Sequence, residues 1–90
     1  MNIDIFRRKI VSGNYEFTQH AKDEAANDNL ETEDIENVIL TGKLSKTMTK
    51  DIRGTRFIIH GFTKDKDEVE VACRILASGK LRIITVYSKR

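Results

Sequence analysis

The spacing of apolar residues changes partway along the chain, at Gly42. Before Gly42, apolar side chains recur every three or four positions, as they do on one face of an amphipathic helix. After Gly42 the period is two, which is typical of strands whose alternate side chains point to opposite faces. Helices gathered before a run of strands predict an α+β fold, with N-terminal helices packed on one face of a small antiparallel β-sheet meander.

Three helices and one short extended segment are expected in the first half. The predicted helices cover residues 3–12, 18–28 and 32–42, and residues 15–17 form a candidate edge strand. Thr18 and Thr32 are the predicted N-caps, because their side-chain oxygens can accept hydrogen bonds from amides of the first helical turn. Gly42 is expected to close the third helix as a C-terminal glycine.

The second half predicts four strands joined by turns. The predicted strands are 43–50, 55–62, 69–77 and 81–87, with turns at 51–54, 64–67 and 78–79. Alternation then assigns one set of side chains to a sheet face without helices. On the second and third of these strands, this set is Arg56, Ile58, His60, Glu70, Ala72, Arg74 and Leu76. Arg56, His60 and Arg74 are therefore expected to share an open face.

Length and composition narrow the class of protein. The 90 residues fit a single domain, residues 1–90. No apolar run approaches the ~20 residues that a membrane helix needs, and no signal-peptide pattern follows the N-terminus, so we expect a cytoplasmic protein with no membrane contact. The single cysteine, Cys73, lies in an apolar strand pattern and is interpreted as a buried hydrophobic residue, with a nucleophile as the alternative. No metal-ligand cluster and no cofactor motif is present.

Charge is distributed unevenly along the chain. Residues 1–42 carry four Lys/Arg and nine Asp/Glu, a net charge of −5, whereas residues 43–90 carry twelve Lys/Arg and five Asp/Glu, a net charge of +7. Two interpretations stay open. The basic half presents a surface to an acidic partner or a phosphate backbone, or the two halves neutralise each other across the fold.

Three short motifs carry a resemblance to a known family. They are FTQHA at residues 17–21, TEDI at residues 32–35 and ITVY at residues 84–87. This set resembles a family of small prokaryotic proteins with an F-[ST]-x-H-A opening and an I-T-x-Y ending, which is similar to the RelE/ParE/MqsR-like toxin superfamily. The resemblance covers nearly the whole chain in the same element order.

The resemblance implies a small sheet with helices on one face, a basic cleft and cleavage of messenger RNA, often on the ribosome. It also implies a cognate antitoxin protein as partner, while other superfamily members inhibit gyrase without cleaving RNA. The chain departs from the family pattern at Glu24 and Asp28, where basic residues are usual on the histidine helix. Acidic side chains there would repel RNA and shift its contacts to the strands.

Metal-independent RNA cleavage needs a base for the 2′-hydroxyl, an acid for the leaving oxygen and a cation for the phosphorane. The candidate catalytic residues are His20, Arg74 and Tyr87. His20 follows a helix N-cap, where the helix dipole disfavours the imidazolium and leaves a neutral base, or it is a structural histidine at the strand–helix corner. Arg74 either pairs with a buried acid or meets a ligand. Tyr87 is an acid, a base, a stacking platform or an amphipathic core-edge residue.

Four further residues are candidates for RNA binding: Arg56, His60, Arg82 and Lys46. His60 is also explained as a packed strand residue. The lysines of segment 43–50 are equally explained as a block against edge-to-edge pairing of sheets.

Three functional hypotheses follow. The first is the toxin of a toxin–antitoxin pair, acting as a metal-independent endoribonuclease on messenger RNA, with a homodimer as a candidate assembly. The second is a non-catalytic protein-binding module on the same fold. The third is a nucleic-acid binder without cleavage, whose affinity would fall steeply with salt.

Overall fold

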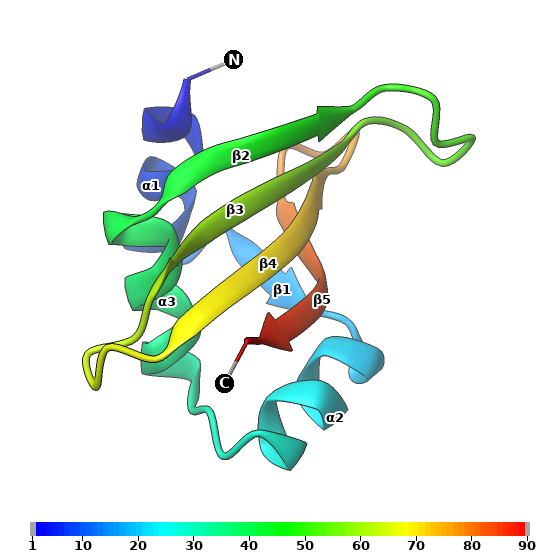
Figure 1. The fold of residues 1–90 in the computed structure, drawn as a ribbon. Coiled ribbons are helices and arrows are strands. Elements are labelled where there is room, and N and C mark those ends of the chain that lie inside the picture. The colour runs from blue at the N-terminus through cyan, green and yellow to red at the C-terminus, as the bar shows by residue number, and fades with distance from the viewer. Residues whose placement is uncertain (1, 90) are drawn as a thin grey trace.

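The computed structural model describes residues 2–89 and has an α+β architecture, which confirms the predicted fold class (Figure 1). The helices are α1 (Ile3–Val11), α2 (Gln19–Asn27) and α3 (Thr32–Thr41). The strands are β1 (Tyr15–Phe17), β2 (Lys43–Met48), β3 (Arg56–Phe62), β4 (Glu68–Ile75) and β5 (Leu81–Ser88). They form one sheet in the order β1-β5-β4-β3-β2.

The sheet is mixed, although the predicted meander is present within it. Strands β2 to β5 pair antiparallel with their neighbours in sequence. The predicted edge strand β1 pairs parallel with β5, with Glu16 opposite Arg82. Strand β4 ends at Ile75, so Leu76 lies in the following turn, where its amide donates to the carbonyl oxygen of Lys80 at 2.9 Å. The predicted end of this strand, at residue 77, is therefore two residues too late.

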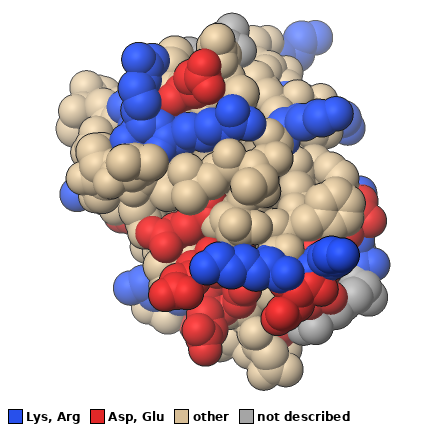
Figure 2. Space-filling view, turned by 90° about the vertical axis from the view of Figure 1, so that its left-hand side faces the viewer, with Lys and Arg blue, Asp and Glu red and all other residues tan. Residues whose placement is uncertain are grey.

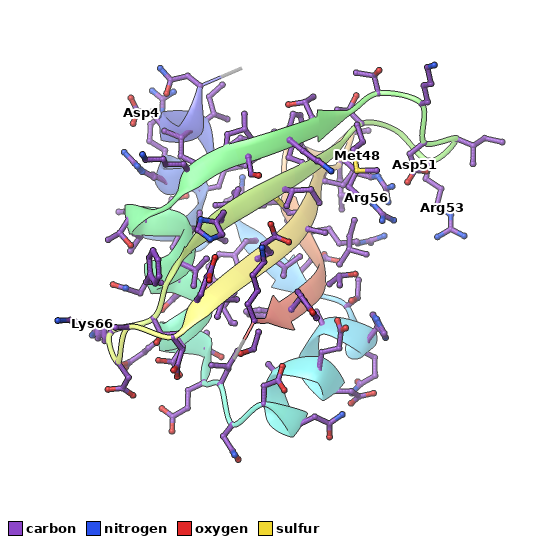
Figure 3. The ribbon with its side chains drawn as sticks, in the orientation of Figure 1. Asp4, Met48, Asp51, Arg53, Arg56 and Lys66 are labelled. Carbon is purple, nitrogen blue, oxygen red and sulfur yellow. The ribbon has the colours of Figure 1, made fainter. Side chains whose placement is uncertain are left out.

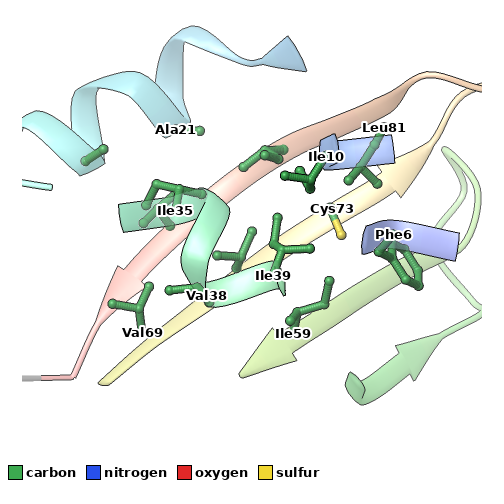
Figure 4. Close-up of a cluster of buried hydrophobic side chains, with 14 of the residues drawn as sticks. Phe6, Ile10, Ala21, Ile35, Val38, Ile39, Ile59, Val69, Cys73 and Leu81 are labelled. Atoms are coloured by element: carbon green, nitrogen blue, oxygen red, sulfur yellow. The ribbon is translucent and has the colours of Figure 1, made fainter. Parts of the chain in front are cut away.

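The hydrophobic core lies between the sheet and the helices (Figure 4). Each helix contributes the apolar side of its 3.6-residue pattern: Phe6 and Ile10 from α1, Ala21 and Ala25 from α2, and Ile35, Val38 and Ile39 from α3. Alternate residues of β3, β4 and β5 meet them, among them Ile59, Val71, Cys73 and Ile83. The ring of Phe6 packs edge-on against Phe57 with 5.1 Å between centroids. Burying such a side chain contributes about 1.5–3 kcal/mol relative to exposure.

The predicted helix ends are partly right. The hydroxyl oxygen of Thr18 caps α2 by accepting from the amide of Ala21 at 3.1 Å, as expected. Thr32 is not the N-cap of α3; that residue is Glu31, whose amide donates to the Asp34 carboxylate at 2.8 Å. The acid two residues beyond Thr32 thus ties the helix start to the preceding residue, an arrangement of the capping-box type.

Gly42 follows α3, but its backbone is extended and not left-handed, with φ −85° and ψ −171°. A glycine is required there for a different reason. A Cβ atom at this position would lie 2.3 Å from the carbonyl oxygen of Val38 and 2.6 Å from that of His60. The end of α3 therefore approaches β3 backbone to backbone, and this contact fixes how the helix layer sits on the sheet.

Candidate functional site: the open face of the sheet

The sheet face opposite the helices carries most of the predicted functional residues. We call it the open face. Because Phe57, Cys73, Leu81 and Ile83 point into the core, their neighbours Arg56, Arg74 and Arg82 point to the opposite side. The structure thus confirms that alternation places Arg56, His60 and Arg74 on one face.

Three arginines lie in one line across the open face. Arg74 is opposite Arg82 on β5, and Arg56 is opposite Arg74 because Phe57 pairs with Cys73 in the antiparallel register. We call Arg56, Arg74 and Arg82 the arginine row. Met48 on β2 and Glu16 on β1 extend this line to both edges of the sheet. Like charges on directly opposite residues repel, so the row needs anions close by.

Asp51 supplies one such anion from the loop 49–55 between β2 and β3. Its Oδ2 atom accepts from Nη2 of Arg74 at 2.9 Å and lies 3.4 Å from Nη2 of Arg56. Its Oδ1 atom accepts from the amide of Arg53 at 2.9 Å. The amide hydrogen bond from Arg53, followed by the charges of Arg74 and Arg56, holds the pKa of Asp51 below its usual value. Figure 3 shows Asp51, Arg53 and Arg56 gathered at this end of the sheet, near Met48.

The two arginines bound by Asp51 keep unused hydrogen-bonding capacity. Only 10% of the Arg74 side chain is exposed, since the loop backbone at Gly54 closes over it. The Nε atoms of Arg56 and Arg74 are buried and have no hydrogen-bond acceptor among residues 2–89. A guanidinium offers five N–H donors, and buried donors are normally paired. This end of the sheet can therefore bind more anionic oxygen atoms than Asp51 provides.

Arg82 has a separate partner. Its Nε atom donates to the Glu16 carboxylate at 2.9 Å, between directly paired residues of β5 and β1. Both side chains are partly exposed. This ion pair ties the parallel strand β1 to the sheet and neutralises the third member of the arginine row.

A second line of polar residues crosses the open face farther along the strands. His60 on β3 is opposite Glu70 on β4, which is opposite Tyr87 on β5. This line lies four residues from the arginine row along β3, about 13 Å at the rise of a strand. Tyr87 is 58% exposed, and its hydroxyl group makes no hydrogen bond with any described residue. Tyr87 is therefore accessible to a ligand.

His60 is oriented by two neighbours. Its Nε2 atom lies 2.5 Å from Oε2 of Glu68, and its ring packs edge-on against Phe62 with 5.6 Å between centroids. The hydrogen bond from His60, and then its charge, lower the pKa of Glu68. An imidazole held by a carboxylate is the usual arrangement of a general base or acid. His60, which the sequence made a candidate for RNA binding, is thus also a candidate general base or acid.

The strip of the open face between the arginine row and the line of His60, Glu70 and Tyr87 has weakly polar side chains. It contains Ile58, Ala72 and Thr85 from the three central strands, and it ends at Lys46 on β2. Lys46 is exposed, and β2 is an edge of the sheet. The open face can therefore accept a flat group between cationic and aromatic side chains.

His20 lies on α2, outside this arrangement. Its side chain is 68% exposed, and its Nε2 atom lies 3.3 Å from Oε1 of Glu24. The same Glu24 oxygen accepts from the amide of Val86 at 3.0 Å. Within the described part of the chain, no hydrogen bond or ion pair joins His20 to Arg74 or Tyr87. His20 is therefore not joined to the other two candidate catalytic residues by these interactions.

The carboxylate of Glu24 has a structural role at the edge of β5, and this role explains why the residue is acidic. Strand β1 is too short to cover the whole edge of β5, and α2 runs along the remainder. The hydroxyl of Thr18 donates to the carbonyl oxygen of Ile84, and Glu24 accepts from Val86. Side chains of α2 thus replace the missing strand partner of β5. A basic residue in place of Glu24 has no acceptor for the Val86 amide.

Cys73 is a core residue. It is fully buried, and its thiol contacts the carbonyl oxygen of Phe57 at 3.7 Å. Burial raises the pKa of the thiol to about 12. The thiolate needed for nucleophilic chemistry is therefore disfavoured, which supports the hydrophobic interpretation.

Most ion pairs join residues of the same half of the chain. On the face shown in Figure 2, Asp and Glu gather mainly in the lower part of the view, where Lys and Arg lie against them, and further Lys and Arg lie in the upper part. The Glu16–Arg82 pair joins the two halves. Other pairs stay within one half: Asp4–Arg7, Glu24–His20, Asp51–Arg74, Glu68–His60 and Glu70–Lys89. Neutralisation across the fold is therefore partial.

Two negative findings concern the described residues 2–89. They contain no group of three or more His, Cys, Asp or Glu side chains arranged to hold a metal ion. Their helices are all too short or too polar to cross a membrane.

Sequence reasoning missed Asp51 and Glu68 as parts of this face. Asp51 was assigned to a turn, and the only available signal was the presence of an acid in a basic segment. It is 23 positions from Arg74, and only the sheet register and the path of the loop bring the two side chains together.

Comparison with known proteins gives one family. Residues 17–88 match the profile of a family described as a domain of unknown function, DUF4258. Neither the curated proteins nor the solved structures gave a match to this chain.

Proposed function

Because the chain belongs to the DUF4258 family, whose description assigns no activity, we propose a function from the open face: a toxin-type, metal-independent endoribonuclease acting on messenger RNA. The observation that carries this proposal is the arrangement of two lines of side chains across one accessible sheet face. One line is the arginine row. The other contains His60 and Tyr87.

The two lines supply the groups that RNA binding requires. Arg56 and Arg74 offer guanidinium donors for phosphate oxygen atoms, which they can bind bidentately. The exposed ring of Tyr87 offers a surface on which an unpaired base can stack. Lys46 adds positive charge at the β2 edge. These contacts do not depend on base identity, which suits a single-stranded messenger RNA as substrate.

The same face contains candidates for the chemical step. A base removes the proton of a 2′-hydroxyl, the 2′-oxygen bonds to the adjacent phosphorus, and the bond to the 5′-oxygen breaks as that oxygen takes up a proton. His60, held by Glu68, is the candidate base, and the Tyr87 hydroxyl is the candidate acid. Arg74 lies in the arginine row, about 13 Å along the strands from the line of His60 and Tyr87, so it binds a neighbouring phosphate of the same RNA strand. His20 remains a second candidate base, at the α2 side of β5.

Cleavage of a labelled single-stranded RNA by the purified protein tests the proposal. We expect His60→Gln and Tyr87→Phe each to slow cleavage by about 10²–10⁴-fold, the usual contribution of a general acid or base. His20→Gln tests the second candidate in the same assay. Lys64→Gln is the matched control, because Lys64 is exposed on the β3–β4 hairpin, and we expect it to cleave at the rate of the unchanged protein.

Intact RNA after incubation with a folded, unmodified protein would reject the enzymatic proposal. Induction in a bacterial host adds a cellular readout, since growth arrest with loss of messenger RNA is expected of the active protein and not of Tyr87→Phe. The proposal also assigns the protein to the cytoplasm and to a complex with a cognate antitoxin.

A second candidate function is a non-catalytic protein-binding module. The observation in its favour is that β2 is an edge strand whose residues are mostly exposed. A partner segment could add to this edge by backbone hydrogen bonds. Copurification of a stable partner, together with intact RNA, would favour this function over the first.

A further inference from the structure

We propose that Arg56 and Arg74 form a phosphate-binding site and that the Asp51 carboxylate is an internal mimic of the phosphate, which closes the site until the loop 49–55 moves. In this proposal, Asp51 controls whether Arg56 and Arg74 can bind a phosphate. The site itself does not depend on the proposed function; only the assignment of RNA as the source of the phosphate rests on it.

The carboxylate occupies the position that an anionic ligand would take. A single oxygen, Oδ2, contacts both guanidinium groups, at 2.9 Å from Arg74 and 3.4 Å from Arg56. A phosphate group has several oxygen atoms and matches the fork of a guanidinium better than one carboxylate oxygen does. The unpaired Nε atoms of Arg56 and Arg74 are the donors that such additional oxygens would reach.

The burial of Arg74 indicates a binding site and not an ordinary ion pair on the protein surface. Its side chain is nine-tenths buried on a face that no helix covers, since loop 49–55 lies over it. A buried cation with an unpaired donor is costly unless another interaction compensates for it. Phosphate binding would supply that compensation and would satisfy both Nε atoms.

Asp51, which closes the site, lies in a loop that can move without breaking hydrogen bonds between strands. Asp51 lies between β2 and β3, and its loop is held by a local turn in which Gly54 donates to the carbonyl oxygen of Asp51 at 3.0 Å. Gly54 has a φ of +114°, a conformation that glycine adopts at low cost. The neighbouring Ile52 is 98% exposed, so little apolar packing opposes displacement of the loop tip.

Asp51→Asn tests the proposal because it removes the competing charge and leaves both arginines in place. Inorganic phosphate is titrated into the full chain at constant ionic strength, and binding is followed by calorimetry and by the melting temperature. Asp65→Asn is the matched control, since Asp65 is an exposed acid of the β3–β4 hairpin loop and its loss changes net charge equally.

We expect the Asp51→Asn protein to bind phosphate about tenfold more tightly than the unchanged protein, as competition with a resident anion predicts. At about ten times the dissociation constant, phosphate should raise its melting temperature by about 5–10 °C. The Asp65→Asn protein should respond as the unchanged protein does. Equal responses of the two variants would overturn the proposal.

A second measurement does not depend on the stability of the variant. Phosphate titrated into the unchanged protein should shift the Nε–H resonances of Arg56 and Arg74 more than that of the exposed Arg8. Shifts no larger than that of Arg8 would also overturn the proposal.

A single-stranded RNA oligonucleotide distinguishes the source of the phosphate. If Asp51→Asn increases the affinity for RNA more than the affinity for inorganic phosphate, the site is assigned to phosphodiesters. If it increases the affinity for inorganic phosphate more, the site is assigned to free phosphate or a phosphate monoester. Phosphate binding by Asp51→Asn without RNA cleavage by any variant would support this site and reject the ribonuclease, so the two proposals fail separately.

Discussion

The substitution Phe6→Ala tests whether α1 is an integral part of the folding unit, although the family match begins only at residue 17. Phe6 is fully buried and meets Phe57 edge-on. Truncating a buried Phe to Ala typically costs about 3–5 kcal/mol, because the ring loses its burial and leaves a cavity. The aromatic pair accounts for about 0.5–1.5 kcal/mol of such a loss.

This cost is large relative to the stability of the whole domain. At about 0.05–0.15 kcal/mol per residue, a chain of 90 residues has roughly 5–13 kcal/mol of unfolding free energy. We therefore expect Phe6→Ala to remove about a quarter of the stability or more. Urea unfolding followed by far-ultraviolet circular dichroism measures the difference, since the chain contains no tryptophan.

Val11→Ala is the matched control on the same helix. Its side chain is 79% exposed, so its unfolding free energy should stay within about 0.5 kcal/mol of the unchanged protein. A loss below about 1 kcal/mol for Phe6→Ala, with an unchanged urea dependence, would refute the reasoning, because so small a cost is far below the range for buried aromatic residues. The helix α1 would then be an appendage of the domain.

Three further predictions concern single side chains. The Cys73 thiol, whose pKa burial raises to about 12, should resist alkylation at neutral pH in the folded protein and react at the rate of a free thiol in denaturant; fast reaction of the folded protein would contradict the burial. Burial and the hydrogen bond to Glu36 raise the pKa of Tyr15 from 10.0 to about 12, so its contribution to stability is complete below pH 10.0 and is lost between pH 10.0 and about 12. Urea unfolding should show this loss as a difference between the unchanged protein and Tyr15→Phe that shrinks as the pH rises through this window; a constant difference would argue against the shift. Glu24→Ala leaves the Val86 amide without its acceptor and should lower the unfolding free energy by about 1–3 kcal/mol, against a negligible change for the exposed Asp23→Ala in the same urea assay.

The sequence was most informative wherever the period of the pattern was regular. Alternation along β3 and β4 correctly placed Arg56, His60 and Arg74 on one face, since side-chain direction in a strand depends only on parity. The same reasoning included Leu76 in a strand that ends at Ile75, because alternation does not show where a strand ends. The sequence also predicted an edge strand at residues 15–17, but not its parallel pairing with β5, which a local pattern does not encode.

Which charged residues pair depends on tertiary structure, so the sequence did not identify most of the ion-pair partners. Arg74 was expected either to pair with an acid or to meet a ligand, and the sequence did not identify the acid. Asp51 reaches Arg74 only because the β2–β3 loop folds back over the sheet. Likewise, Glu24 was read as an acid that would repel RNA, whereas its carboxylate binds the edge of β5. In both cases the deciding contact joins segments that are distant in sequence.

The acids that hold the cations of the open face come from different parts of the fold. Glu16, the partner of Arg82, belongs to β1, and Glu68, the partner of His60, belongs to β4. Both acids are part of hydrogen-bonded strands, so moving their backbone would disrupt the sheet. Asp51 alone among these three acids lies in a loop, and the two cations it holds are adjacent in the arginine row. The proposed phosphate site therefore depends on this loop, since Arg56 and Arg74 become free for another anion only after Asp51 is displaced.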